Sequence, residues 1–385
     1  MLTAPSHLRP CLKGDTILID ATTGWPLSLE QFAKAGDRSV LTLRDAGVIR
    51  PQLPEGSRDL PTAQLYRVTT YCGRSIEACA EQPFLTRDGW KPLSKLTAAD
   101  AVAVVVEFPQ LFGRGDTDTE LLKLLAYLTA SETTGDGMAP AIDDDVVRQD
   151  FEAAVASKDD EYTELVGGDG TAYLRVHGKG GGRSRVIAFL DLVGVHGVCA
   201  SAKVVPDFVF GLRREKLRLY LNRLFTCDGR PEASSITYHC KSVHLARQVQ
   251  HLLARFGINC ALRGREREGV LDSVVLSIGS KQDVLRFIDE IGFLGGKAVK
   301  AESTRTLLYQ VRMVDPPLDR LGPILFDEVF AIEETEAAPV YDLSIGHFHN
   351  FIANDFIVHS AGAPPIASAV DAGWQLSAGA PALQP

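Results

Sequence analysis

The spacing of hydrophobic positions changes twice along this chain. Up to about residue 109, short runs rich in β-branched and aromatic residues alternate with glycine and aspartate turns, which is typical of an all-β unit. These runs predict strands at 16–19, 40–43, 63–70, 75–78 and 102–108. Similar runs return at 324–332, 340–345, 350–352 and 356–358. We therefore expect one β unit whose two parts are separated by an insert of about 200 residues.

The insert, from about 116 to 302, alternates helical and strand-like spacing. Two apolar runs, at 121–131 (LLKLLAYLTAS) and 217–228 (LRLYLNRLFTCD), have helical spacing and end near a small or acidic residue. They indicate a weak internal repeat, that is, two copies of one α/β module. In the second copy the spacing predicts helices at 243–255 and 283–291 and a strand at 270–278. On periodicity alone, two buried interdomain helices explain the apolar runs more simply.

Composition adds a local contrast in charge. With 385 residues and 45% hydrophobic positions, the chain can form two or three domains with real cores. The net charge of -9 argues against a protein that coats nucleic acid along its whole surface. Between 201 and 265, however, 12 Lys or Arg stand against 4 Asp or Glu, whereas between 116 and 170 the count is 3 against 15. The second repeat is thus a candidate phosphate-binding face, and the first would repel DNA.

Cysteine spacing and hydropathy exclude several classes. The seven cysteines are an odd number without paired CxxC spacing, so the sequence predicts neither a zinc site nor a disulfide framework. A reducing cytoplasm fits this usage best. No apolar run approaches 18 residues, and the N-terminus lacks the order of a secretory signal. We expect no membrane association.

The two ends of the sequence carry motifs of a known family. Cys11 opens the segment CLKGDT, and residues 340–360 read VYDLSIGHFHNFIANDFIVHS. Together they resemble the ends of an intein, and the chain is similar to the inteins of bacterial replicative DNA helicases. The resemblance implies an all-β Hint (hedgehog/intein) horseshoe whose termini meet at one active site. Self-processing would need no cofactor, and its partners would be the chain's own flanking extein segments.

The insert resembles a second family that inteins often host. The segment VPDFVFGLRREKLRLYLNRLFTCDG, with Lys203 just upstream, is similar to the DOD-type LAGLIDADG homing endonucleases. The resemblance implies an α/β two-repeat domain. The expected boundaries are an upstream flank at 1–10, Hint halves at 11–112 and 323–360, the endonuclease at 113–322, and a downstream flank at 361–385. The composition of that last flank predicts disorder.

In the family, a thiol at the upstream junction attacks the preceding carbonyl, and Cys11 has that position. A free thiol is only slightly ionised at neutral pH, so the step needs help from a Thr-x-x-His motif. Here Cys79 stands at the threonine and Gln82 at the histidine. Glutamine can donate a hydrogen bond to a developing oxyanion but cannot deliver a proton near neutral pH. We expect a slow first step, with Cys79 packed rather than reactive.

The resemblance also assigns the downstream junction. Asp342 matches the carboxylate that helps to coordinate the two junctions, His349 the histidine of the final step, and His359 the penultimate histidine. The family then places an asparagine, whose amide releases the intein, before a Cys, Ser or Thr. If Ser360 fills the asparagine position, the amide and the next nucleophile are both missing. If the asparagine is deleted, Ser360 is the nucleophile, and release still has no reactant.

For the endonuclease, the resemblance places Mg²⁺ between carboxylates of the two motif helices and Lys203 near the scissile phosphate. Asp228 fits one ligand position. Ser131 takes the other aspartate position, and Glu132 would reach the metal only with a shift. We therefore expect impaired splicing and weak or vestigial binding of double-stranded DNA. The alternatives are a working metal-dependent, site-specific endonuclease and a DNA-binding remnant without cleavage.

Overall fold

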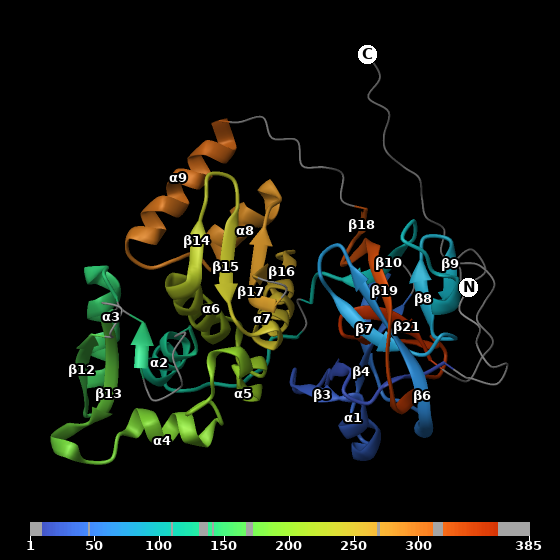
Figure 1. Cartoon of the computed structure of the whole chain (residues 1–385), viewed down its shortest axis with the longest axis horizontal. Helices are drawn as coiled ribbons and strands as arrows, with labels where there is room; N and C mark the ends of the chain where they lie inside the picture. Colours follow the sequence, from blue (N-terminus) through green and yellow to red (C-terminus); the bar gives the residue numbers. More distant parts are fainter. Residues whose placement is uncertain are drawn as a thin grey trace.

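The computed structural model describes residues 10–44, 47–108, 111–130, 138–140, 142–166, 172–267, 270–310 and 319–360. A β unit and an α/β insert lie side by side (Figure 1). The chain leaves the β unit after β10 (Ala101–Val105) and returns with β18 (Arg320–Leu321). The prediction of an all-β fold interrupted by an α/β insert is confirmed. Within the described segments, no helix is long and apolar enough to cross a membrane.

The β unit is built on one antiparallel sheet with the strand order β1-β7-β6-β19-β10-β21-β8-β9, and β20 pairs with β21. Two small hairpins and helix α1 complete the unit. Its remaining elements are β1 (Leu12–Lys13), β2 (Ile17–Ile19), β3 (Pro26–Ser28), α1 (Leu29–Ala35), β4 (Val40–Arg44), β5 (Val48–Gln52), β6 (Gly56–Thr70), β7 (Ser75–Ala78), β8 (Pro83–Thr86), β9 (Gly89–Pro92), β19 (Ile324–Ser344), β20 (Asn350–Ala353) and β21 (Phe356–His359).

One strand differs from its prediction. The spacing predicts two strands at 324–332 and 340–345, but β19 runs without a break for 21 residues. Its largely exposed middle, from Ala331 to Ala338, pairs with the second half of β6, and its mostly buried end, from Val340 to Ser344, pairs with the exposed first half of β6. Register shifts near Ala338, beside Pro339, bend this two-stranded ribbon. Few side chains in the middle of β19 are buried, so this stretch leaves no hydrophobic period in the sequence.

The insert contains the two predicted copies, each with a long helix followed by an antiparallel sheet. The predicted strand at 270–278 and helix at 243–255 are confirmed, and the helix expected at 283–291 begins at Lys281. The first copy contains α2 (Thr119–Ala130), β11 (Met138–Pro140), α3 (Asp145–Ala156), β12 (Asp160–Val166), β13 (Ala172–Gly178) and α4 (Arg185–Leu192). The second contains α5 (Asp207–Phe210), α6 (Arg214–Asp228), β14 (Gly229–Pro231), β15 (Ile236–Cys240), α7 (Val243–Arg255), β16 (Ala261–Arg267), β17 (Val270–Ile278), α8 (Lys281–Glu290) and α9 (Gly296–Gln310).

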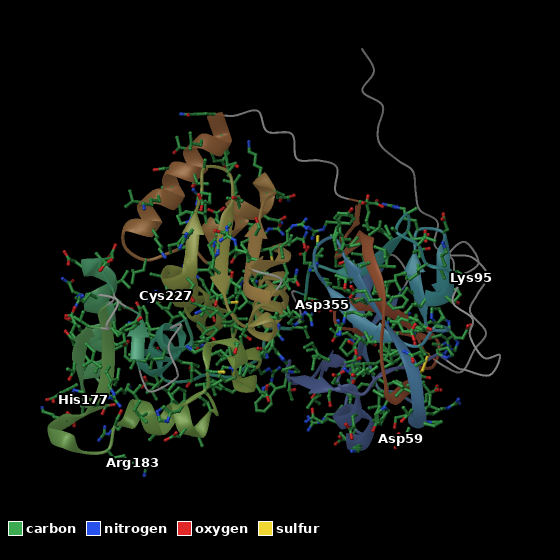
Figure 2. All side chains as sticks on the ribbon, viewed as in Figure 1. Asp59, Lys95, His177, Arg183, Cys227 and Asp355 are labelled. Atoms are coloured by element: carbon green, nitrogen blue, oxygen red, sulfur yellow. A yellow bond between two sulfur atoms is a disulfide. The ribbon has the colours of Figure 1, made fainter. Side chains whose placement is uncertain are left out.

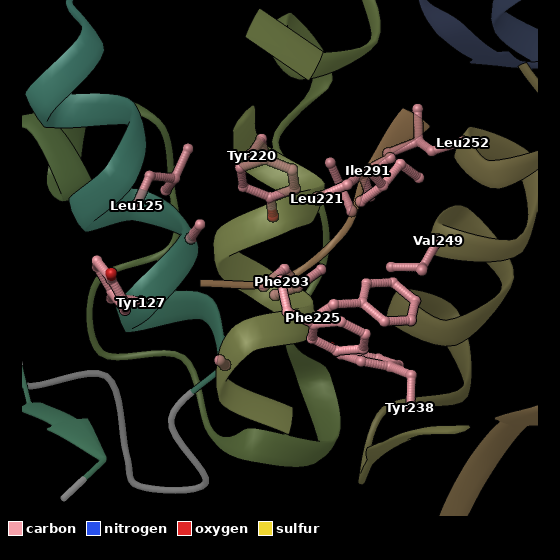
Figure 3. Packing of buried hydrophobic residues seen from close by; sticks show 14 of the residues in the cluster. Leu125, Tyr127, Tyr220, Leu221, Phe225, Tyr238, Val249, Leu252, Ile291 and Phe293 are labelled. Atoms are coloured by element: carbon pink, nitrogen blue, oxygen red, sulfur yellow. The ribbon is translucent and has the colours of Figure 1, made fainter. Parts of the chain in front are cut away.

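Helices α2 and α6 pack against each other and join the two copies. Leu125 of α2 and Tyr220, Leu221 and Phe225 of α6 are almost completely buried in one core (Figure 3). Complete burial of one such side chain stabilises the fold by about 1.5–3 kcal/mol. The apolar runs of the sequence are therefore interior helices, as their spacing requires.

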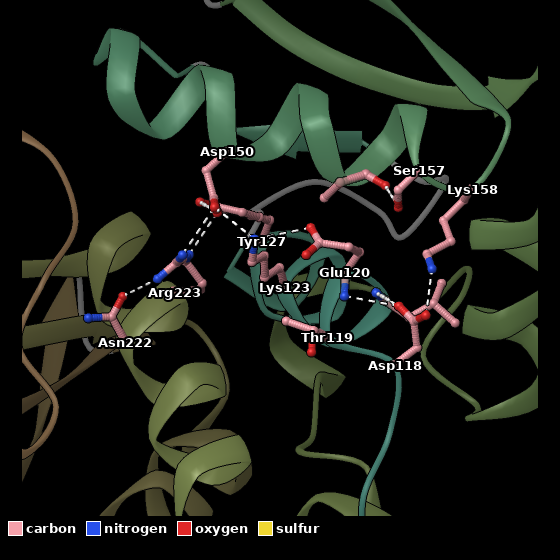
Figure 4. A network of polar contacts seen from close by, with 12 residues as sticks. Asp118, Thr119, Glu120, Lys123, Tyr127, Asp150, Ser157, Lys158, Asn222 and Arg223 are labelled. Carbon is pink, nitrogen blue, oxygen red and sulfur yellow. Dashed lines mark hydrogen bonds and ion pairs between the residues drawn. The ribbon is translucent and has the colours of Figure 1, made fainter.

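Acidic residues of the first copy hold this helical core together. Asp150 of α3 accepts hydrogen bonds from Nε of Arg223 at 2.8 Å and from the Tyr127 hydroxyl at 2.9 Å, and it lies 3.0 Å from Lys123 (Figure 4). Asp118 pairs with Lys158 at 2.7 Å. The acidic excess of this copy, from which the sequence predicts repulsion of DNA, is thus partly structural.

A buried polar cluster connects the insert to the β unit, and we call it the interdomain clasp. It consists of His251 and Arg255 from α7, Arg74 from the turn before β7, and Asp355 from the β20–β21 turn, which lies between the two parts (Figure 2). Nδ1 of His251 lies 2.8 Å from Oδ1 of Asp355, and Nε of Arg255 donates to Nε2 of His251 at 3.3 Å. This pattern requires a neutral histidine, and burial lowers the pKa of His251 accordingly.

Candidate functional site

Strand pairing positions Cys11 at the centre of the candidate site. Leu12 of β1 pairs with Ala78 of β7 on one side and with Tyr341 of β19 on the other. Because both ladders are antiparallel, extending each by one residue places Cys11 opposite Cys79 and opposite Asp342. Asp342 is only 2% exposed. Three residues from distant parts of the sequence thus meet at one end of β1.

Cys11 and Cys79 form a disulfide, with their Cα atoms 5.6 Å apart. Both residues are buried, and the Cys79 N–H donates to the Cys11 carbonyl at 3.1 Å. The sequence prediction of no disulfide framework is therefore corrected by this one bond, while Cys79 is packed in the interior as expected. The spacing gave no signal because strand pairing joins cysteines that are 68 residues apart.

Gln82 lies in the turn after β7, where its N–H donates to the Cys79 carbonyl at 3.0 Å. Its side chain is fully buried, and Nε2 donates to the carbonyl oxygens of His359 at 2.8 Å and of Pro83 at 3.2 Å. The resemblance assigns this position to the upstream amide. The hydrogen bonds of the Gln82 amide are instead made to the downstream junction and to its own neighbour.

The downstream junction is built by β21 and the loop before β20. The Ser360 N–H donates to the His349 carbonyl at 2.9 Å, and Nδ1 of His359 donates to the Ser360 carbonyl at 2.7 Å. The rings of His349 and His359 stack with centroids 6.2 Å apart, and Trp90 packs edge-on against His359. The sequence reasoning did not single out Trp90, which carries no motif signal beyond its place in a short hairpin.

The junction holds unusual polar atoms. Burial lowers the pKa of His359, so the neutral imidazole is favoured even though its hydrogen bond to Ser360 acts in the opposite direction. Oε1 of Gln82, Nδ1 of His349 and Oγ of Ser360 are buried without a hydrogen-bond partner in the described part of the chain. Such atoms are uncommon in folded proteins, and a catalytic role is one of the explanations for them. This arrangement can polarise two successive carbonyls, those of His359 and Ser360.

Two endonuclease candidates, Lys203 and Asp228, lie near the ends of the motif helices. The Lys203 ammonium is buried and donates to the carbonyls of Leu128 and Thr129, in the last turn of α2. Asp228 ends α6. Ser131 and Glu132 lie outside the described residues. Within the described ranges, no cluster of three or more His, Cys, Asp or Glu side chains could hold a metal ion.

The sheet of the second copy presents a basic face. Antiparallel register places Arg230 beside Thr237, and His239 and Arg263 on either side of Val275, all on the face away from the core. Burial and the charges of Arg230 and Arg265 lower the pKa of His239, because both guanidinium groups lie near its ring. The basic excess of 201–265 therefore includes a continuous surface on this sheet.

A model of the intein splicing domain matches residues 25–360. Replicative DNA helicase DnaB of Rhodothermus marinus is 25% identical over an alignment that covers 91% of this chain and 46% of that protein. The corresponding helicase of Synechocystis sp. is 23% identical, with 91% and 49% covered. The chain spans about half the length of these curated relatives.

Two solved structures are also similar. The crystal structure of a DnaB intein from Synechocystis sp. aligns with 92% of this chain and 100% of its own length, at 12% identity and a TM-score of 0.35. The structure of I-DmoI in complex with DNA and Mn aligns with 46% of this chain and 98% of its own length, at 15% identity and a TM-score of 0.33.

Proposed function

This chain belongs to the intein splicing family, and we propose that it starts self-processing at Cys11 but cannot complete it at Ser360. The observation that carries the proposal is the segment 79–82, which contacts both ends of the domain. Cys79 is bonded to Cys11, and Gln82 binds the carbonyl of His359. Both junctions therefore share one buried site, as splicing requires.

In the first step, the thiolate of Cys11 attacks the carbonyl carbon of Pro10. The new S–C bond replaces the C–N bond, and the Cys11 nitrogen takes up a proton. Gln82 cannot deliver that proton, and its amide is engaged downstream. Loss of a positioned acid typically slows such a step by about 10²- to 10⁴-fold. We propose slow upstream cleavage.

At the downstream junction, the hydrogen bonds favour Ser360 in the asparagine position. His359 donates to the Ser360 carbonyl, which is the carbonyl that a side-chain amide at this position would attack. The family match also ends at residue 360. Because Ser360 has no amide, we propose that cyclisation and release do not occur.

Dithiothreitol tests the upstream step directly. The thiol should reduce Cys11, capture the thioester and raise the yield of a fragment that begins at Cys11. A Cys11→Ser variant is the matched control, because it keeps a smaller and weaker nucleophile at the same position. Equal, thiol-independent yields from both proteins would exclude the thioester.

As a second function, we propose that the insert is a LAGLIDADG-type domain that binds double-stranded DNA weakly and has lost most cleavage. The packed helices α2 and α6 and the basic face with Arg230 and Arg263 support this proposal. Asp228 would be one oxygen ligand for Mg²⁺, which prefers carboxylates. Ser131 cannot supply a second carboxylate.

Two measurements separate the alternatives for the insert. Binding of duplex DNA that weakens steeply with salt would support the DNA-binding remnant, since counterion release governs phosphate contacts. Mg²⁺-dependent cleavage of a long cognate site that is abolished by Asp228→Asn would instead establish a working endonuclease. That result would make Glu132 the replacement ligand.

A further inference from the structure

The thiol that should start self-processing is already bonded. Cys11 is 1% exposed and Cys79 is fully buried, and the two form a disulfide although Cys79 lies 68 residues further along the chain. The backbone fixes this pairing, because β1 pairs with β7 and the Cys79 N–H binds the Cys11 carbonyl. The bond therefore joins two segments that the backbone already pairs, and the fold is the same with or without it.

We propose that Cys79 is a thiol-oxidation site that reversibly masks the nucleophile Cys11. This inference rests on the proposed function, in which Cys11 attacks the Pro10 carbonyl. In the disulfide, the Cys11 sulfur has no thiolate to offer, so the attack cannot begin. Reduction returns the thiol and starts the reaction.

The proposal takes hydrogen peroxide as the oxidant, a small two-electron acceptor that leaves only water. One thiolate attacks the peroxide and becomes a sulfenic acid as water leaves. The second thiolate attacks that sulfur, the S–S bond forms, and a second water leaves. Two thiols thus lose two electrons and two protons, and one peroxide becomes two waters.

Three other described cysteines are poor competitors for this bond. Burial raises the pKa of Cys72 to about 11 and those of Cys240 and Cys260 to about 12, so their thiolate fractions at neutral pH are negligible. Cys199 is exposed, and the hydroxyl of Ser201 lowers its pKa.

The experiment uses the full chain, either treated with hydrogen peroxide or reduced with a phosphine that is then removed. Each form is digested without reduction and searched for the peptide that links Cys11 to Cys79. In parallel, each is incubated with hydroxylamine, which captures a thioester without reducing a disulfide. The oxidised form should contain the linked peptide and yield at least about tenfold less Cys11-initiated fragment, because a disulfide sulfur is not a nucleophile.

A Cys79→Ser variant is the matched control. Its peroxide-treated form should contain no linked peptide, because its Cys11 has no partner, and any loss of cleavage in this variant would report a sulfenic acid at Cys11 rather than a disulfide. Absence of the linked peptide, or equal cleavage by both forms of the unaltered chain, would overturn the proposal. If the linked peptide forms but the reduced chain yields no fragment, the self-processing function fails and the proposed mask falls with it, while the disulfide itself stands.

Discussion

Replacing Asp355 with alanine probes the interdomain clasp. The Asp355 side chain is 13% exposed, and its carboxylate binds His251 at 2.8 Å and lies 3.8 Å from Nε of Arg74. Burial opposes its ionisation, but His251 and two neighbouring arginines hold the pKa of Asp355 below its usual value. Nε and Nη1 of Arg74 have no hydrogen-bond partner among the described residues. The Asp355 carboxylate therefore supplies the negative charge that balances the buried guanidinium of Arg74.

Removing one partner of a buried ion pair costs about 3–5 kcal/mol, because the other charge stays buried. We expect Asp355→Ala to lower the free energy of unfolding by that amount. Asp355→Asn keeps an oxygen for His251 but loses the charge, so it should cost about 1.5–3 kcal/mol, the value of a charged hydrogen bond. Asp37→Ala, at an 83% exposed side chain, is the control and should stay within about 0.5 kcal/mol.

Urea unfolding, followed by circular dichroism, measures these differences, and hydrogen exchange locates them. Because a chain with two parts need not unfold in one step, the first transition is compared. Exchange should quicken in α7 and in the β20–β21 hairpin. If Asp355→Ala matched Asp37→Ala in both measurements, the clasp would contribute nothing and the reasoning would be refuted.

Three further predictions concern chemistry, acidity and DNA. Gln82→His should speed upstream cleavage by about 10²-fold or more through a restored proton donor, measured by fragment yield over time; an unchanged rate would place the barrier elsewhere. Burial lowers the folded-state pKa of both His251 and His359, so the unfolded chain binds more protons than the folded chain as the pH drops below about 6.5. The free energy of unfolding should therefore fall, by up to about 1.4 kcal/mol per pH unit for each residue. Unfolding that is insensitive to pH between 7.5 and 5.5 would contradict this. Arg263→Ala should weaken duplex binding and lower the salt slope by about 1, seen in titrations at several salt concentrations.

The sequence predicts the elements with clear periodicity and the residues that occupy motif positions. The helix at 243–255 and the strand at 270–278 follow from spacing, and the all-β fold with its α/β insert follows from the order of such segments. The middle of β19 and the first half of β6 escape prediction because few of their side chains are buried. The motif register also singled out Cys11, Gln82 and Ser360, and the structure buries all three.

The contacts between distant segments could not be predicted. Nothing near Cys79 in the sequence indicates Cys11 as its partner, because a strand ladder brings the two together. The same holds for Gln82 and the His359 carbonyl, and for the clasp of His251 with Asp355. Each of these contacts depends on tertiary packing, and no local pattern in the sequence indicates it.

The central claim is that Cys11 starts a reaction that Ser360 cannot finish. Intact mass spectrometry of the reduced full chain, incubated with hydroxylamine, tests it most directly. We predict a fragment that begins at Cys11, no such fragment from Cys11→Ala, and no species that joins Pro10 to Ser360 or Ala361. Equal cleavage in Cys11→Ala, or a ligated product of the two flanks, would contradict the account.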